Sequence, residues 1–421
     1  MKTLSPAKSD LNQQRTWFPR ELALFGLMLA SAVFSGCGGA VVKETQAETK
    51  PVKAAPPSVP MWLGNPARNF YGNGPWSDKA LKVVWDFKTQ WSSSGRFHKD
   101  RWAGSGWPGQ AAVVGDRVYF GSADSRVYCL DKKDGSVIWS YKTSDSAKSS
   151  PAVVGDRLVI GNLDHYVYCL NANDGTLVWK YQTGFETDSS PAIVDGRVYI
   201  GGEDHFYYCL DLKDGALIYK TALGGSVEGG STILDGKIFV DTEAGDLFCL
   251  NQADGAVIWK ASIGADSNST PAVVEGLVYT AAEDGTVRAY QQASGEPVWK
   301  FKAEGGLNVK TKEKTGFWSS PIVSKGRVYI GSNNGYFYSL TSDKGELVWS
   351  HLARAAIWGT SPVADGRVIV GDKAGWIYML AAADGKLISE LKIGDNVDAT
   401  PAILDGRIYV GAFNGKFSCL N

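Results

Sequence analysis

The sequence lacks three features that would place it in a common functional class. Its 43 basic and 44 acidic side chains leave a formal net charge of −1, so composition gives no support for a nucleic-acid-binding or polybasic membrane surface. The uncharged apolar stretch at 22–36 has fifteen residues, whereas a membrane-spanning helix needs roughly 20. The G-x-S-x-G, H-E-x-x-H and P-loop patterns of common enzyme sites are also missing.

The residues that are abundant point to strands and turns. The chain has 421 residues, with 49 glycines, 15 tryptophans and 18 tyrosines. Many glycines and aromatic residues, with strand-like stretches between them, are typical of an all-β repeat protein.

The N-terminal region predicts export and a membrane anchor. The apolar stretch 22–36 follows a basic segment and ends with Ser35 and Gly36 directly before Cys37. This resembles the lipobox of bacterial lipoproteins, in which the cysteine carries the lipid, including palmitate, and becomes the mature N-terminus. The resemblance implies a signal peptide at 1–36 and lipidation of Cys37, with an ordinary cleaved signal or an uncleaved anchor as alternatives.

Residues after Cys37 suggest where the protein is anchored. Gly38, rather than Asp, follows the cysteine, which favours the outer membrane, facing the periplasm, if the host is Gram-negative. Residues 37–60 are small, charged or proline and lack apolar periodicity, so we expect a flexible tether. Residues 61–421 are then the folded body.

A period of 40 residues runs through this body. One position of the repeat continues after a ten-residue insertion, and its members are Cys129, Cys169, Cys209, Cys249, Ala289, Ser339, Met379 and Cys419. If the repeats pack as successive sheets, equivalent positions of neighbouring sheets lie about 10 Å apart, which is too far for a disulfide. Ala289, Ser339 and Met379 fill the same position in other repeats, so it takes a modest apolar group. We therefore expect these cysteines to be buried free thiols in an eightfold repeat.

Each repeat predicts four antiparallel strands. Asp195-Gly196 separates two apolar runs, and Asp-Gly or Asn-Gly pairs such as Asp134-Gly135 and Asn334-Gly335 recur between later runs. Such pairs favour type I′ hairpin turns, which need positive φ at both central residues. Four strands in about 40 residues form one blade of a β-propeller.

The two ends of the body predict how the ring closes. The chain ends at the third strand of its eighth repeat, whereas 81–89, which contains Trp85, reads as a fourth strand without the first three. We expect 81–89 to complete the C-terminal blade, because this closure covers two exposed sheet edges. The predicted fold is an all-β, eight-bladed propeller.

The repeats carry a family resemblance. The stretches at 130–139 and 170–179 resemble the PQQ-type repeat, the match spans about 80–421, and 62–75 is similar to the lead-in of PQQ-like propellers. A lipidated, single-domain, eight-bladed member is most similar to the BamB family of outer-membrane assembly lipoproteins. The resemblance implies that an aromatic residue near the start of each fourth strand locks its blade to the next; these residues are Trp85, Trp139, Trp179, Tyr219, Trp259, Trp299 and Trp349.

Breaks in the repeat are the better candidates for function, because loops on a rigid scaffold carry most binding residues. Insertions at 91–107 and 304–318, and the segment 353–358, all precede a first strand and are expected on one face around the channel mouth. The candidate binding face consists of Trp91, Arg96, His98, Arg101, Trp102, Trp107, Lys310, Lys312, Trp318, Arg354 and Trp358. Glu186, Asp188 and Glu228 in comparable loops predict an acidic arc opposite this aromatic and basic arc.

Three functional classes follow from these features. The BamB-like class is a non-enzymatic scaffold that binds protein partners at the membrane, without nucleic acid, metal or cofactor. A small-molecule or glycan receptor that uses the tryptophan-rich mouth is the alternative. A PQQ-dependent dehydrogenase is less favoured, because the resemblance would require adjacent cysteines and no two cysteines here are adjacent.

Overall fold

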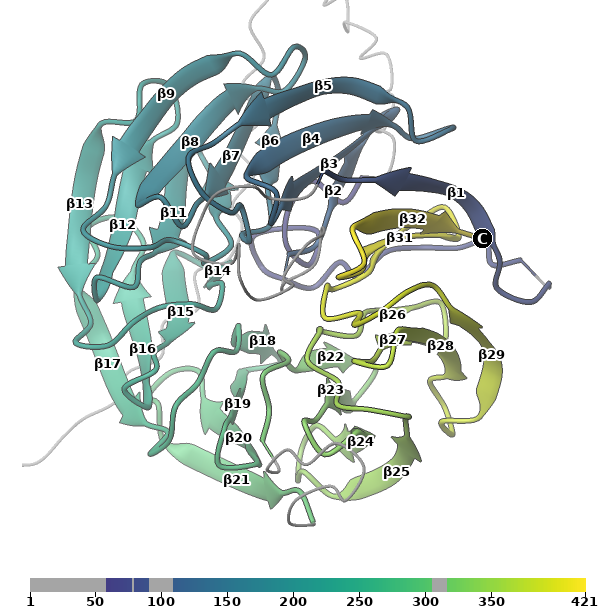
Figure 1. Cartoon of the computed structure of the whole chain (residues 1–421). Helices are drawn as coiled ribbons and strands as arrows, with labels where there is room; N and C mark the ends of the chain where they lie inside the picture. The colour runs from purple at the N-terminus through teal and green to yellow at the C-terminus, as the bar shows by residue number, and fades with distance from the viewer. Residues whose placement is uncertain (1–57, 78, 91–108, 305–315) are drawn as a thin grey trace, which may run out of the picture. The chain divides into compact units, whose positions relative to one another are not determined.

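The computed structural model describes residues 58–77, 79–90, 109–304 and 316–421. The described residues form thirty-two strands in eight four-stranded antiparallel sheets. The sheets follow one another in a closed ring (Figure 1). The predicted all-β, eight-bladed propeller is therefore confirmed. In this part of the chain no helix is long and apolar enough to cross a membrane.

The first four blades have the same plan, from the innermost strand to the outermost. Blade 1 contains β2 (Ala112–Val114), β3 (Arg117–Ser122), β4 (Arg126–Asp131) and β5 (Val137–Lys142). Blade 2 contains β6 (Ala152–Val154), β7 (Arg157–Gly161), β8 (Tyr166–Asn171) and β9 (Leu177–Gln182). Blade 3 contains β10 (Ala192–Val194), β11 (Arg197–Gly201), β12 (Phe206–Asp211) and β13 (Leu217–Ala222). Blade 4 contains β14 (Thr232–Leu234), β15 (Lys237–Asp241), β16 (Asp246–Asn251) and β17 (Val257–Ser262).

The remaining blades repeat this plan and close the ring. Blade 5 contains β18 (Ala272–Val274), β19 (Leu277–Ala282), β20 (Thr286–Gln291) and β21 (Pro297–Lys302). Blade 6 contains β22 (Ile322–Ser324), β23 (Arg327–Gly331), β24 (Tyr336–Thr341) and β25 (Leu347–Leu352). Blade 7 contains β26 (Val363–Ala364), β27 (Arg367–Gly371), β28 (Trp376–Ala381) and β29 (Leu387–Lys392). Blade 8 contains β30 (Ala402–Leu404), β31 (Arg407–Gly411), β32 (Lys416–Leu420) and, from the other end of the chain, β1 (Val83–Lys88).

The predicted ring closure is also confirmed. Strand β1 pairs antiparallel with β32, with Trp85 opposite Cys419 and Phe87 opposite Phe417. The phenyl rings of Phe120 in blade 1 and Phe417 in blade 8 stack with their centroids 4.1 Å apart. The first and last blades thus share a core, which ties the two ends of the folded body together.

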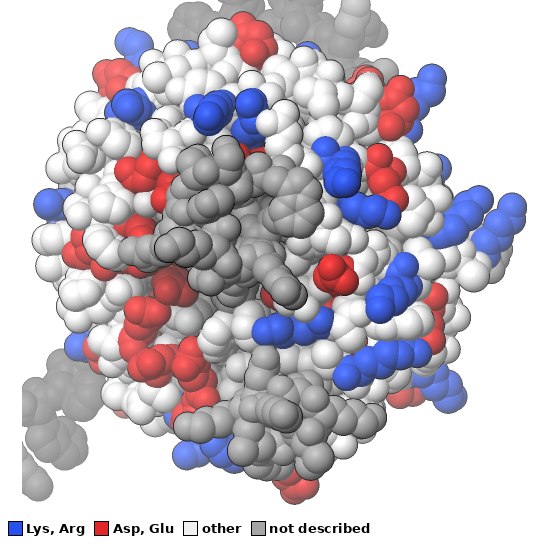
Figure 2. Space-filling view, in the orientation of Figure 1, with Lys and Arg blue, Asp and Glu red and all other residues white. Residues whose placement is uncertain are grey.

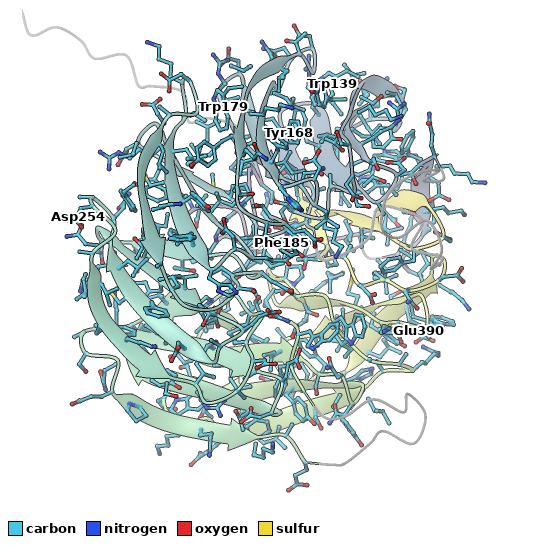
Figure 3. All side chains as sticks on the ribbon, turned by 60° about the vertical axis from the view of Figure 1, so that its left-hand side comes forward. Trp139, Tyr168, Trp179, Phe185, Asp254 and Glu390 are labelled. Atoms are coloured by element: carbon cyan, nitrogen blue, oxygen red, sulfur yellow. The ribbon has the colours of Figure 1, made fainter. Side chains whose placement is uncertain are left out.

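In seven of the eight blades, an aromatic residue of the fourth strand contacts the following blade, whereas β29 of blade 7 has Ser389 at this position. The indole N–H of Trp179 donates to the carbonyl of Leu212 at 2.9 Å, and its ring packs against Gly215. Trp139 repeats this contact with Ala172 and Gly175; Figure 3 shows Trp139 and Trp179 in successive blades. Every member of the set donates to a backbone carbonyl of the next blade, Tyr219 through its hydroxyl and the others through the indole N–H: Trp85, Trp139, Trp179, Tyr219, Trp259, Trp299 and Trp349.

The turns agree only partly with the expectation from Asp-Gly pairs. Asp195 and Gly196, between β10 and β11, have φ of 49° and 72°, as a type I′ turn requires. Between the third and fourth strands the glycine alone has positive φ, for example Gly215 at 76°, so the expected type I′ turn there is wrong. Gly215 N–H instead donates to Asp211 O across a longer turn. A Cβ on Gly215 would lie 2.7 Å from the Trp179 ring, so this glycine is needed for blade contact.

The repeated cysteine position lies in the third strand of each blade. Cys129, Cys169, Cys209, Cys249 and Cys419 are buried free thiols. Burial raises the pKa of Cys129 to about 12, which keeps its thiol protonated and unreactive. His165 and His205 stand four residues before Cys169 and Cys209, and their φ angles are 70° and 71°. They occupy turn positions that are glycine in most other blades.

Candidate functional site

The residues before each first strand build the centre of the propeller. Ser or Thr occupies the second position before most first strands, and the backbone N–H of one blade donates to the hydroxyl of the next. We call this set the hydroxyl belt; its residues are Ser150, Ser190, Thr270, Ser320, Thr360 and Thr400. Donor–acceptor distances run from 2.8 to 3.3 Å. The belt therefore holds the innermost loops of successive blades at a fixed spacing.

A second set of residues lies two positions before the belt. Unlike the belt, it differs from blade to blade. We call it the mouth ring, and its described members are Lys148, Asp188, Glu228, Asn268, Trp318, Trp358 and Asp398. Six of these, all except Lys148, line one pocket together with Trp62. Residues that stand 40 or 50 positions apart in sequence thus meet at one place.

The segment before β1 forms the floor of this pocket. Val59 pairs with Val113 of blade 1, so the folded body includes residues of the predicted 37–60 tether. Arg68 is buried, and its guanidinium donates to the carbonyls of Trp62 at 2.6 Å and Ser231 at 2.8 Å. Here the belt is interrupted, because Gly230 has no hydroxyl. A Cβ on Gly230 would lie 3.4 Å from the Trp62 ring, so the glycine leaves room for the floor.

Two tryptophans form one wall of the pocket. The ring centroids of Trp318 and Trp358 are 4.1 Å apart and the rings are inclined at 40°. The ammonium of Lys373, in the turn between β27 and β28, lies 3.0 Å from the centroid of Trp358. Both tryptophans were predicted as binding residues, and the structure brings them together in blades 6 and 7.

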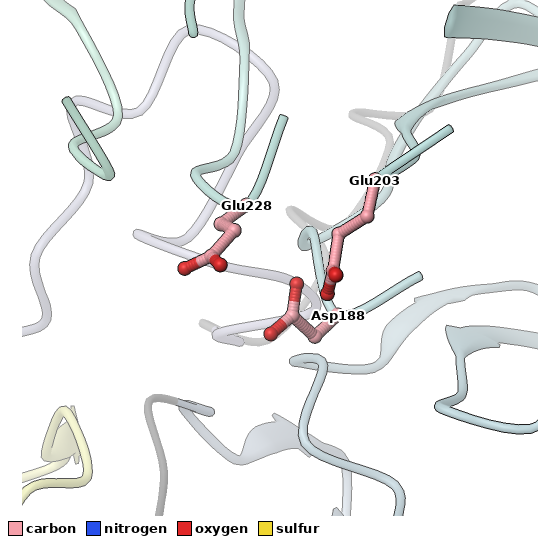
Figure 4. Close-up of side chains that lie close together, drawn as sticks. All are labelled: Asp188, Glu203 and Glu228. Carbon is pink, nitrogen blue, oxygen red and sulfur yellow. The ribbon is translucent and has the colours of Figure 1, made fainter. Parts of the chain in front are cut away.

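Three carboxyl groups form the opposite wall. Asp188 and Glu228 belong to the mouth ring, and Glu203 lies in the turn between β11 and β12. One carboxylate oxygen of each lies within 4.8 Å of the others, and Figure 4 shows the three side chains converging. We call them the acidic triad. This geometry is close enough for the three groups to share one cation.

Burial and mutual repulsion raise the pKa of all three carboxyl groups of the triad. Burial, opposed by Lys148 and reinforced by Glu186, raises the pKa of Asp188 to about 6. Burial together with Asp188 raises the pKa of Glu203 to about 8 and that of Glu228 to about 10. Glu203 and Glu228 are therefore protonated at neutral pH, whereas Asp188 is mostly ionised. A cation bound beside the triad would favour the ionised form of each carboxyl group.

Sequence reasoning identified part of this acidic wall and missed the rest. Glu186, Asp188 and Glu228 were expected there, whereas Glu203 and Glu243 were not. Glu203, Glu243 and Glu283 occur at intervals of 40 residues, in the second-to-third turns of blades 3, 4 and 5. That spacing was the available signal, since equivalent turns lie on the same face. Figure 2 shows acidic side chains gathered over these blades and basic ones on the other side of the mouth.

The remaining predicted residues do not all join the pocket. Arg354 lies in blade 7, where its guanidinium binds the Glu390 carboxylate at 2.7 and 2.8 Å and stacks 3.8 Å from the Trp376 ring centroid. It is not among the pocket-lining residues. Cys37 and several predicted binding residues lie outside the described residues: Trp91, Arg96, His98, Arg101, Trp102, Trp107, Lys310 and Lys312.

The pocket is small. Its volume is about 40 Å³, on a measure by which one ordered water needs roughly 10–15 Å³. Among the described residues it has room for the head of one side chain, or for an ion with a few waters.

Comparisons with known proteins agree with this architecture. A family model described as outer membrane protein assembly factor BamB matches residues 82–226, 207–315 and 302–421. A search of curated proteins found no match. The structure of BamB from Moraxella catarrhalis is 18% identical, with a TM-score of 0.63, and the match covers 82% of this chain and 98% of that one.

Other solved structures share the fold. Quinohemoprotein alcohol dehydrogenase from Comamonas testosteroni is 14% identical, with a TM-score of 0.70, over 86% of this chain and 80% of that one. The computationally designed protein Ika8 is 15% identical, with a TM-score of 0.66, over 75% of this chain and 96% of that one. At such identities the likeness concerns the fold alone.

Proposed function

The chain belongs to the family described as outer membrane protein assembly factor BamB, and on that premise we propose that it is a non-enzymatic scaffold that docks a protein partner in outer-membrane protein assembly. The observation that carries the proposal is the family match over residues 82–421, which covers all eight blades. Lipidation of Cys37 would hold the propeller at the periplasmic side of the outer membrane.

The channel mouth is the proposed docking face. Its centre presents Trp318 and Trp358, half-buried, beside an acidic wall. Tryptophan is enriched among the residues that dominate binding energy in protein interfaces. The rigid belt beneath supports this role, because a preorganised surface loses little entropy on binding.

A crosslinking pull-down of the full chain, with its N-terminal region intact, tests the proposal. The expected result is recovery of components of the outer-membrane assembly machinery, with a large loss for the Trp318→Ala/Trp358→Ala double variant. The matched control is Leu177→Ala/Val178→Ala, which removes two exposed apolar side chains from β9 on the outer rim. Recovery of no such component by the unmodified protein would overturn the proposal.

A receptor for a small molecule or glycan is the second candidate, and the paired tryptophans over a cavity favour it. A ligand-dependent rise in melting temperature that Trp318→Ala abolishes would support it. The 40 Å³ volume argues for a ligand that inserts only one small group.

A PQQ-dependent dehydrogenase is the third candidate function. Against it stand the small volume of the mouth pocket and the five described cysteines of the propeller, which are all buried free thiols. Reduction of an artificial electron acceptor after addition of PQQ and calcium would reverse this preference.

A further inference from the structure

We propose that the mouth receives one arginine side chain of the docked protein, with its guanidinium between the acidic triad and the Trp318–Trp358 pair. This inference rests on the proposed function, because it names the group by which a partner would be recognised. The triad and the tryptophans are brought together by the same pocket: Asp188, Glu228, Trp318 and Trp358 all line it, and Glu203 adjoins it through the triad.

Unpartnered polar atoms in the pocket point to a ligand. Asp188 is 5% exposed, and its Oδ1 has no hydrogen-bond partner among the described residues. Trp62, on the floor, is also 5% exposed, and its indole N–H is likewise without a described partner. Buried polar groups are almost always hydrogen-bonded. An incoming group with donors for Asp188, accompanied by a water or peptide carbonyl for Trp62, would complete both.

The distribution of charged groups in this region favours a cation. The carboxyl groups that act on one another here are Glu186, Asp188, Glu203, Glu228 and Glu243. Lys148 is the cation whose charge opposes the raised pKa of Asp188 and of Glu203. A second positive charge would relieve this repulsion directly.

Guanidinium chemistry fits these walls better than the alternatives. Arginine offers five N–H donors in a plane, which can reach several carboxylate oxygens at once, and its flat face stacks on indole rings. A metal ion would use the carboxylates but leave the aromatic wall without a role. A lysine ammonium has three donors on a point charge and gains less from stacking.

The test uses short peptides and the folded protein. Acetyl-Gly-Arg-Gly-amide is titrated while the indole NMR signals of ¹⁵N-tryptophan-labelled protein are followed. Parallel titrations replace arginine by citrulline, which is neutral and of similar shape, or by lysine. We expect saturable shifts with the arginine peptide, binding at least tenfold weaker with lysine, and none with citrulline. Equal binding of the citrulline or lysine peptide, or no binding of arginine, would overturn the inference.

Variants of the triad locate the site. Asp188→Asn and Glu228→Gln should each weaken arginine-peptide binding at least tenfold. Glu346→Gln, on the exposed turn between β24 and β25, is the matched control and should leave binding unchanged. Melting temperatures of all three variants check that they remain folded. Calcium added alone is a further arm: saturable calcium binding that Glu228→Gln abolishes would assign the triad to a metal instead.

The pH dependence has a definite sign. Asp188, Glu203 and Glu228 face one another together with Glu186, Glu243 and Lys148. Asp398 also lines the pocket, and Lys373 lies against the Trp358 ring. A cation binds the ionised carboxylates. Affinity for the arginine peptide should therefore rise between pH 6 and pH 9, through the range in which Asp188 and Glu203 ionise. Affinity that is constant or falls over this interval would contradict the proposal.

Failure of this inference is separable from failure of the scaffold proposal. If the unmodified protein and the Asp188→Asn/Glu228→Gln variant recover the assembly machinery equally well, the scaffold stands and the arginine site is wrong. If neither recovers it but the peptide binds as expected, the arginine site stands and the identity of the partner is wrong.

Discussion

The positions of the hydroxyl belt and the mouth ring lie two residues apart in blades 2 to 8 and follow opposite rules. Belt positions carry Ser or Thr in six blades, and each hydroxyl accepts a hydrogen bond from the preceding blade. Mouth-ring positions carry a lysine, three acidic residues, an asparagine and two tryptophans. The belt maintains equal spacing between blades, whereas the mouth ring makes the two sides of the pocket different. The residues that repeat from blade to blade thus hold the ring together, whereas the residues that differ form the proposed docking site.

Trp179→Ala should have the largest effect, because it removes a repeated contact. The buried indole and its hydrogen bond to Leu212 are lost, and we expect the free energy of unfolding to fall by about 3–5 kcal/mol. Chemical denaturation measures this change. Trp318→Ala, in the variable ring, should cost about 1 kcal/mol. Equal losses of unfolding free energy for Trp179→Ala and Trp318→Ala would contradict the distinction between repeated positions and mouth-ring positions.

Arg68→Met tests the place where the belt is interrupted. The variant leaves the buried carbonyls of Trp62 and Ser231 without their donor, which should lower stability by about 2–3 kcal/mol. Arg354→Met removes a guanidinium of the more exposed Arg354–Glu390 pair and should cost no more than about 1 kcal/mol. A larger loss of stability for Arg354→Met than for Arg68→Met would contradict this expectation. It would show that the Arg68 hydrogen bonds do not take the place of the hydroxyl that is missing at Gly230.

Glu228→Gln should stabilise the protein, in contrast to changes in the belt. The folded state raises the pKa of Glu228 to about 10, so the folded protein keeps a proton that the unfolded chain releases above about pH 4.3. Stability from this group therefore falls as pH rises from about 4.3 towards 10. We expect a gain of up to about 2 kcal/mol at pH 8 and almost none at pH 4. Denaturation curves at the two pH values measure it, and a gain independent of pH would contradict it.

Thr360→Val should have the smallest effect. The variant keeps the shape of the side chain but removes the acceptor for Ser320 N–H, so we expect a loss of about 1 kcal/mol. Hydrogen exchange of the Ser320 amide should accelerate, while that of the matched Gln110 amide, bound to Ser150, should not. Unchanged exchange at Ser320 would show that the belt does not hold the inner loops.

Much of the fold could be predicted because the same pattern of strands and turns occurs eight times in the sequence. The spacing of Cys129 to Cys249 fixed the blade length, and Trp85 without preceding strands indicated the closure with β32. The turn type at Asp214-Gly215 was mispredicted, because the Trp179 ring from the preceding blade decides it. Local sequence contains the Asp-Gly pair but not the neighbour that packs on it.

The site could be predicted only in outline. Trp318, Trp358, Asp188 and Glu228 were assigned to one face because all four precede a first strand. Glu203 was missed, since it belongs to another turn and meets Asp188 only in the folded protein. Trp62 was assigned to a lead-in segment, and nothing in its neighbourhood indicated that it would become the floor of the pocket.

The sequence by itself determined the number of blades, the strand that closes them and the residues that join them, because these depend on period and on contacts between equivalent positions. Tertiary structure alone decided which side chains share the mouth. Closing a ring brings residues 188, 228, 318 and 358 together at one pocket, and burial there raises the pKa of Asp188 and Glu228. A linear sequence contains neither the distances between these residues nor the exclusion of water from them.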